Sequence, residues 1–373
     1  MKKRTFIILV IILGILVGAG AVVMHFQTPR QPAVAMGSPL LQSLPANDIV
    51  SIKFDGVGSP VTLNHMGDQW VVQERFGYPA DFKRITDLVH DLKDAKVGRM
   101  FVASEADLKR LSLKSPDHKE ALEGEKAMRV RMPDGQGEVV LDLSVGDTRT
   151  RGEEKLPDGQ FVRLGDDPRV YLIDQPLTAY LTGPAEWVAQ TPVAVEGDEV
   201  QEVRCLGPDP KSLRFAFVRP DKDKPFEMTH PKVSKKIKHT SLNRLTSALS
   251  SLKISDVTDP STMPQAVKAG VSPCLIYTLF NGMVYRVYPG NDCPEGLCYV
   301  RFEVDYQPPG PYNGQVNEEK ESRKPDPRET AKKAEEENLR LHPWVFIIPK
   351  WQHKAFITHL DELVETQKGE GKG

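Results

Sequence analysis

The pattern of hydrophobic and polar residues divides the chain into an apolar N-terminal run and a long globular part. Residues 6–26 are almost uniformly apolar, and Lys2, Lys3 and Arg4 precede them. A helix of this length rises about 31 Å, close to the thickness of a bilayer core. Basic residues beside a span stay in the cytoplasm. We therefore expect residues 1–27 to anchor the chain in a bacterial inner membrane, with the N-terminus cytoplasmic and the bulk periplasmic.

A cleaved signal peptide is the alternative interpretation of this run. Ala33-Val34-Ala35 offers a small-x-small site. The run is longer than the roughly 7–15 apolar residues of a signal peptide, and Pro29 and Pro32 separate it from the site. Gly14 and Gly18 form a small-xxx-small pair, a candidate for helix packing that also arises readily in any Gly- and Ala-rich span.

Beyond the run, alternating and helical periodicities predict an α+β domain. Residues 28–47 are Pro-rich and predict an extended linker. Within the first domain, 48–192, a helix starts at Pro79, Ala80 and Asp81, Ser104 is a good helix N-cap, and Pro133-Asp134-Gly135 signals a hairpin. The expected strands are 49–54, 61–63, 69–72, 97–102, 128–132, 139–143, 161–164 and 170–173, and the expected helices 81–92, 105–111 and 177–181, with Phe82, Ile85, Leu88, Val89 and Leu92 on one face.

The same order of elements returns in residues 193–366. Expected strands are 200–205, 213–218, 226–228, 274–279, 284–288, 299–302 and 344–348, with a helix over 234–252 and a closing helix from Lys354. We therefore expect two tandem repeats of an antiparallel sheet packed with helices, preceded by one transmembrane helix. The alternative is two similar domains whose common order arose by chance. Residues 367–373 are expected to be a disordered tail.

The second repeat carries a charged insertion, residues 307–340. It opens with Pro-Pro-Gly-Pro, which excludes a central strand, and becomes helical from about Arg328. Glu329 with Lys333 and Glu336 with Arg340 are spaced i,i+4, as in a solvated helix. A solvated excursion and a docking element for a partner are the two interpretations.

Length and charge limit the class of protein. About 345 residues remain beyond the anchor, which suggests two domains of ordinary size. The net charge is −2, and without the three N-terminal basic residues it is about −5. Because no domain is basic, nucleic acid is not an expected partner.

Four cysteines lie in the second half, and an even number in an exported chain permits disulfides. Cys293 and Cys298 flank Pro-Glu-Gly-Leu, so a local bridge is plausible. Cys205 and Cys274 lie in separate strand-like runs and are candidates for pairing across a sheet. Free thiols, a metal site and a redox pair are the alternatives, although the sequence shows no second Cys pair or close His pair to complete a metal site.

No signature of catalysis or cofactor binding stands out, so we expect no enzyme, metal or cofactor. P-loop, H-E-x-x-H, G-x-S-x-G and G-x-G-x-x-G patterns in the required contexts are missing from the sequence. The histidines are scattered, and His65, His230, His239 and His353 lack ligand spacing. Candidate acid or base carboxylates flank strand ends and turns, where Asp is common for backbone reasons: Asp142, Asp147, Asp166 and Asp167.

A basic stretch on the second predicted helix is a candidate contact for anionic lipid or an acidic partner: Lys232, Lys235, Lys236 and Lys238. A solvated helix face is the ordinary interpretation. Trp70 and Trp187 are expected to pack in the core or between domains rather than to bind a ligand.

The first repeat resembles the bacterial domain of unknown function 4340 (DUF4340) family. The resemblance rests on the stretches Gln69–Val72, Pro79–Asp81, Leu143–Asp147, Phe161–Arg163 and Val170–Leu172. It covers about residues 49–190, and the second repeat follows only in outline, without a Ser-Val-Gly-Asp signature. The resemblance implies a single-span membrane protein that often accompanies ABC-type transporter subunits related to gliding-motility export, and it implies no catalytic residues.

Taken together, these features predict a membrane-tethered, non-enzymatic accessory protein of an ABC-type transport system. A binding module that holds a lipid, glycan or peptide between the repeats is the first alternative. An envelope enzyme is the second.

Overall fold

The computed structural model describes residues 36–56, 58–152, 154, 156–232, 236–268, 270–308 and 326–365. The predicted anchor with Lys2, Lys3, Arg4, Gly14 and Gly18 lies outside these residues, as does the tail 367–373. Within the described ranges, none of the helices combines the length and apolarity that a membrane span requires.

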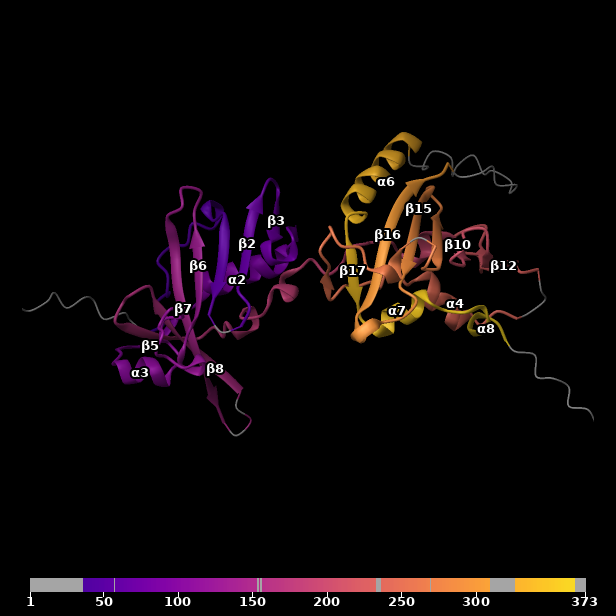
Figure 1. Cartoon of the computed structure of the whole chain (residues 1–373). Coiled ribbons are helices and arrows are strands. Elements are labelled where there is room, and N and C mark those ends of the chain that lie inside the picture. The colour runs from indigo at the N-terminus through magenta and orange to yellow at the C-terminus, as the bar shows by residue number, and fades with distance from the viewer. Residues whose placement is uncertain are drawn as a thin grey trace, which may run out of the picture.

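Two antiparallel β-sheets with helices packed on them make an α+β architecture, and Figure 1 shows the sheets side by side. The first sheet has nine strands in the order β4-β3-β2-β1-β6-β7-β8-β9-β5. Their bounds are β1 Ser51–Asp55, β2 Val61–Met66, β3 Gln69–Val72, β4 Tyr78–Pro79, β5 Val97–Val102, β6 Met128–Pro133, β7 Val139–Arg151, β8 Leu156–Leu164 and β9 Arg169–Ile173.

The second sheet has eight strands in the order β12-β11-β10-β14-β15-β16-β17-β13. Their bounds are β10 Val200–Leu206, β11 Leu213–Val218, β12 Glu227–His230, β13 Asp256–Val257, β14 Cys274–Leu279, β15 Met283–Pro289, β16 Cys298–Tyr306 and β17 Val345–Ile348. Within the described residues the α-helices are α2 Phe82–Asp94, α3 Glu105–Arg110, α4 His239–Thr246, α6 Pro327–Leu341, α7 Lys350–Phe356 and α8 Leu360–Leu363.

The two sheets share one strand order. Without β4, the first sheet has the order β3-β2-β1-β6-β7-β8-β9-β5, and each of these strands corresponds to the strand at the same position in the second sheet. Only β4 has no counterpart. Antiparallel pairs join every neighbouring strand in both. The repeated order expected from the sequence is therefore present in the topology, while the domain limits 48–192 and 193–366 stay predictions.

Helix α2 begins where the sequence predicts. The Asp81 side chain accepts a hydrogen bond from the Arg84 backbone N–H, and Ile85, Leu88 and Leu92 are buried against the sheet. Phe82, expected on the same face, is 62% exposed. At 100° per residue it lies about a quarter turn from the centre of the buried arc, which accounts for the difference.

The second predicted helix, 234–252, is wrong in its limits, because α4 covers only His239–Thr246. Before it, the backbone N–H of Lys238 donates to the carbonyl of Leu363, and Ile237 bridges to Val364. This pairing with the C-terminal segment holds the backbone extended. Beyond Thr246 the chain runs on as turns, and hydroxyls such as those of Ser247 and Ser251 bond to nearby carbonyls and compete with the helical ladder.

The linker prediction, 28–47, is wrong for its second half. The backbone N–H groups of Gly37 and Leu40 donate to the carbonyls of Val97 and Ala95, both at 2.8 Å. Leu40 and Leu44 are buried in the main core. The segment packs on the first sheet because its leucines are buried there and because it hydrogen-bonds to the edge strand β5. It is therefore not a free linker.

The insertion is not a solvated excursion throughout. Residues 309–325 lie outside the described ranges, but α6 packs on the second sheet with Ala334 and Leu341 buried in the core. The Asn338 side chain accepts from the backbone N–H of Val304 in β16. The predicted i,i+4 pairs are replaced by Lys332–Glu336 and by Arg340–Glu337 at i,i+3.

One continuous buried cluster spans both sheets. Arg75, after β3, pairs with Asp256 of β13 at 2.5 Å, and Arg340 of α6 donates to the carbonyl of Pro192 at 2.6 Å. These contacts join the first half of the chain to β13 and α6 of the second.

Candidate functional site

A disulfide closes the loop between β15 and β16. It joins Cys293 to Cys298, five residues apart in sequence, and Cys298 is the first residue of β16. Pro294 opens a 3-10 turn between the two, and Gly296 takes a φ of 82°, which a glycine adopts without steric cost. Cys298 is fully buried, whereas Cys293 is half-buried and the loop residues 294–297 are exposed.

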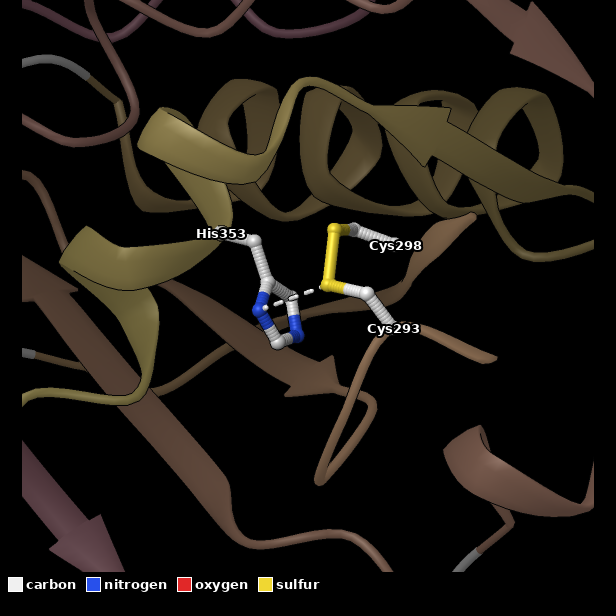
Figure 2. A group of neighbouring side chains, drawn as sticks. All are labelled: Cys293, Cys298 and His353. Atoms are coloured by element: carbon white, nitrogen blue, oxygen red, sulfur yellow. Dashed lines mark hydrogen bonds between the residues drawn. A yellow bond between two sulfur atoms is a disulfide. The ribbon is translucent and has the colours of Figure 1, made fainter. Parts of the chain in front are cut away.

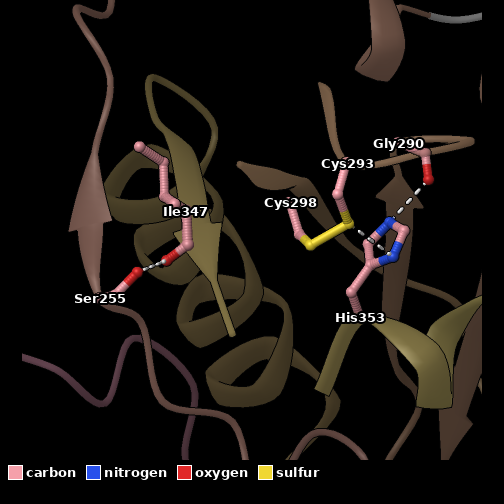
Figure 3. Close-up of a disulfide and its surroundings, with 6 residues drawn as sticks. All are labelled: Ser255, Gly290, Cys293, Cys298, Ile347 and His353. Carbon is pink, nitrogen blue, oxygen red and sulfur yellow. Dashed lines mark hydrogen bonds between the residues drawn. A yellow bond between two sulfur atoms is a disulfide. The ribbon is translucent and has the colours of Figure 1, made fainter. Parts of the chain in front are cut away.

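A buried histidine packs against this disulfide. His353 lies on α7, which begins directly after β17 and turns Gln352, His353 and Phe356 into the protein. Figure 2 shows the imidazole facing the sulfur of Cys293, with Nδ1 at 3.5 Å from Sγ. The other ring nitrogen, Nε2, lies 2.7 Å from the carbonyl oxygen of Gly290, as Figure 3 shows. His353 is 2% exposed.

The carbonyl of Gly290 fixes the tautomer of His353. A carbonyl oxygen only accepts, so Nε2 carries the proton and donates it. In the neutral ring, Nδ1 then presents its lone pair to Cys293 Sγ. Burial lowers the pKa of His353, against smaller raising effects of the Gly290 carbonyl and Asp292, so the ring is neutral near pH 7.

These three side chains form a Cys2His cluster whose ligand atoms lie within 4.8 Å of one another. In the disulfide state the sulfurs hold no thiolate, and the cluster fastens the loop to α7. The two cysteines were predicted as a pair from their local spacing, whereas His353 was not predicted to join them, because it lies 60 residues from Cys293. Only the return of the chain through β17 brings them together, and no local spacing signals it.

Cys205 and Cys274 are free and buried, so the cross-sheet bridge considered from the sequence is not formed. In the register of β10 and β14, Cys205 faces Leu275 and Leu206 faces Cys274. Neighbouring residues of a strand point to opposite faces, so the two thiols are on opposite sides of the sheet. Burial raises both pKa values to about 11, which keeps these thiols protonated and unreactive.

The candidate carboxylates lie apart from this cluster. Asp142 accepts from Nε of Arg129 at 2.8 Å, and Asp167 accepts from Nε of Arg169 at 2.8 and 2.9 Å. Hydrogen bonding by Arg169 lowers the pKa of Asp167. These pairs cover the polar face and a strand end of the first sheet, where an ion pair is an ordinary stabilising feature. Asp166 is exposed.

Asp147 and the Ser-Val-Gly-Asp signature serve packing. The Asp147 backbone N–H donates to the carbonyl of Leu111 at 2.9 Å. A Cβ added at Gly146 would stand 2.2 Å from that same carbonyl oxygen. The glycine therefore lets the segment after α3 lie directly on β7, and Ser144 before it is buried.

The basic stretch precedes α4 and does not lie on it. Residues 233–235, and with them Lys235, are outside the described ranges. Lys236 pairs with Glu365 at 3.2 Å and Lys238 donates to the carbonyl of Asp361 at 3.3 Å, while Lys232 is exposed. Two of the four lysines therefore contact the C-terminal segment of the same chain.

Of the two tryptophans singled out, Trp187 is fully buried and packs on Phe54 with ring centroids 5.0 Å apart. The guanidinium of Arg84 lies over its ring at 4.7 Å. Trp70 is half-buried beside His65, with centroids 5.3 Å apart. Of the other histidines, His230 is half-buried and His239 is exposed. Both tryptophans contact other side chains of the first sheet.

These features define an α+β protein of two like-ordered antiparallel sheets with one disulfide in the second. The chain belongs to the family described as a domain of unknown function, DUF4340, whose model matches residues 70–269, over half of the chain. The match runs further than the resemblance expected from the sequence, because it passes from β3 into the second sheet as far as the segment before β14. No curated protein and no solved structure matches the chain.

Proposed function

We propose that this protein is a single-pass, membrane-anchored periplasmic accessory protein, a non-catalytic partner of an ABC-type transport system. The observation that carries the proposal is the Cys293–Cys298 disulfide. Disulfides persist in oxidising compartments such as the periplasm and are rare in the cytosol. This agrees with export behind an anchor at residues 6–26, and family membership adds the expected association with transporter subunits.

The fold supplies surfaces suited to a partner. Leu339 on α6 is 69% exposed and Trp351 on α7 is 67% exposed, and both belong to helices packed on the second sheet. Exposed large apolar side chains are enriched at protein interfaces when they gather with polar neighbours. We propose α6 as the docking element, since it lies in the insertion, residues 307–340, that the first sheet lacks.

A binding module between the repeats receives less support. At the contact of the two halves, Tyr78 is 4% exposed and Phe346 is fully buried, with ring centroids 6.1 Å apart. These aromatic side chains fill this part of the contact, so they leave no space for a ligand there.

Copurification tests the partner. The full chain, carrying a photo-crosslinking residue at Leu339, is irradiated in cells, extracted in mild detergent and analysed by mass spectrometry. Crosslinks to an ABC-type subunit are expected there and not from Leu122, a matched site of 68% exposure in the first half. If neither Leu339 nor Leu122 gives a crosslink to a partner, the proposed docking element is contradicted.

Thiol labelling in the same cells tests the compartment. In the exported protein only Cys205 and Cys274 should accept a mass tag after denaturation without reductant, and all four cysteines after reduction. Four tagged thiols without reductant would place the chain in a reducing compartment and contradict the proposal.

A further inference from the structure

The Cys2His cluster has the spacing of a metal centre. His353 Nδ1 lies 3.5 Å from Cys293 Sγ, and all three ligand atoms lie within 4.8 Å of one another. Around a tetrahedral zinc ion, with about 2.3 Å to sulfur and 2.0 Å to nitrogen, these two atoms stand about 3.5 Å apart. The distance between His353 Nδ1 and the nearer sulfur therefore already equals the separation of two ligand atoms around one zinc ion.

The surroundings of His353 are those of a metal ligand. Metal-binding histidines usually donate the second ring N–H to a carboxylate or backbone carbonyl, which fixes the ring and leaves the other nitrogen basic. The Gly290 carbonyl accepts from Nε2 at 2.7 Å and aims the Nδ1 lone pair at the sulfur. The same hydrogen bond would hold the ring in place as a ligand once the S–S bond is open.

We propose that, in the reduced chain, Cys293, Cys298 and His353 bind a thiophilic divalent cation such as Zn²⁺. A dithiol reductant supplies two electrons and two protons, so the S–S bond breaks, two S–H groups form and the reductant becomes a disulfide. The cation then displaces both thiol protons into solvent and accepts a lone pair from Nδ1. The site thus has two exclusive states, a disulfide and a Cys2His centre.

The elements that hold the ligands favour this change. His353 is on a helix and Cys298 begins a strand, whereas Cys293 is on the loop after β15. Separating the sulfurs therefore needs movement of the loop alone. Because Cys293 is half-buried beside the exposed residues 294–297, water can complete the fourth position of a tetrahedral centre.

The burial of Cys298 argues against a fast thiol–disulfide exchange centre. An incoming thiolate reaches Cys293 Sγ, and the leaving group is then Cys298, which is fully buried. A thiolate expelled into that apolar site is unfavourable unless a cation or proton compensates it. The geometry favours a pair that changes state slowly and is then held by a cation.

Cobalt titration tests the proposal. The full chain with Cys205→Ala and Cys274→Ala, which leaves only the paired cysteines, is reduced with a phosphine and titrated with Co²⁺ in detergent. We expect one ion per chain, with a thiolate charge-transfer band in the near ultraviolet that excess Zn²⁺ removes. The unreduced chain should show no band, and a band there, or none after reduction, overturns the proposal.

Substitutions of single ligands test whether the cation is bound by all three side chains or by two of them. His353→Gln should weaken Co²⁺ binding at least about 100-fold, since even outer partners of a ligand are worth 10–100-fold. His359→Gln, at an exposed histidine directly before α8, is the matched control and should bind normally. Cys293→Ser, on the exposed loop, gives a second test that does not depend on the buried ring. Unchanged affinity in His353→Gln or Cys293→Ser overturns the three-ligand site.

Discussion

The ring of Tyr78 meets the ring of Trp344 edge to face, with centroids 5.0 Å apart and an interplanar angle of 89°. Tyr78 belongs to β4 of the first sheet, and Trp344 directly precedes β17 of the second. Burial raises the pKa of Tyr78 to about 12, against a smaller lowering effect of Arg340. The phenol is therefore neutral at physiological pH and contributes packing at the contact of the two halves.

Tyr78→Ala should lower the free energy of unfolding by about 3 kcal/mol, because it removes a buried aromatic ring between the sheets. A double-mutant cycle with Trp344→Ala should give a coupling of about 1 kcal/mol, measured by denaturant titration. Trp351→Ala, at an exposed tryptophan, should change stability by less than about 0.5 kcal/mol. Additive effects of Tyr78→Ala and Trp344→Ala would contradict the contact.

Removing the disulfide with Cys293→Ala and Cys298→Ala should cost about 2 kcal/mol of stability, the chain-entropy value for a short loop. The measurement is a urea titration with a metal chelator present. Wild-type chain treated with phosphine should unfold at the same urea concentration as the double variant, and the variant should not respond to phosphine. A wild-type protein insensitive to reduction would show that the bridge adds nothing.

Asp167→Asn should destabilise the protein by about 1 kcal/mol at pH 7 and by progressively less in acid. The sign follows from the lowered pKa of Asp167 in the folded state, caused first by hydrogen bonding from Arg169. Such a group stabilises above its unfolded pKa, near 4, and the contribution is lost as pH falls through the folded value. Asp166→Asn, an adjacent exposed site, makes the same charge change and should show a smaller difference across the same pH series.

Gly146→Ala should be among the most harmful single changes in the first sheet, costing about 2 kcal/mol or more. Its Cβ would stand 2.2 Å from a backbone oxygen and 2.7 Å from the Leu113 side chain, so β7 or the Leu111 segment must move. Gly183→Ala is the matched control, with φ of −74° and no atom within 4 Å of the added Cβ. Equal stability of the two variants would refute the packing role of the signature.

Local chemistry made much of the fold predictable. Ser104 was predicted to be a helix N-cap, and in the structure it caps α3 and exchanges hydrogen bonds with Asp107. Pro133-Asp134-Gly135 turns β6 into β7, and the Asp134 side chain accepts from the Gln136 and Glu138 N–H groups. In each case the stabilising partner lies within four residues, so the signal is contained in the local sequence.

Elements fixed by distant partners were mispredicted. The true start of α4 depends on the bond from Lys238 to Leu363, more than a hundred residues later. Residues 37–44 were expected to extend as a linker, yet Leu40 finds its hydrogen-bond partner at Ala95. His353 joins Cys293 in the same way, through strands that must pair before the two meet. Periodicity reports which face of an element is apolar and is silent about the distant segment that covers it.

The opposite orientations of Cys205 and Cys274 have a consequence for oxidative folding. A slip of β14 against β10 by a single residue would set these two cysteines directly opposite one another and turn every side chain of the slipped strand to the wrong face. In an oxidising compartment a bridge between them would trap that mispaired sheet covalently. A Cys205–Cys274 crosslink is thus a chemical marker of misfolded chains, and the native register of β10 and β14 keeps the two thiols apart.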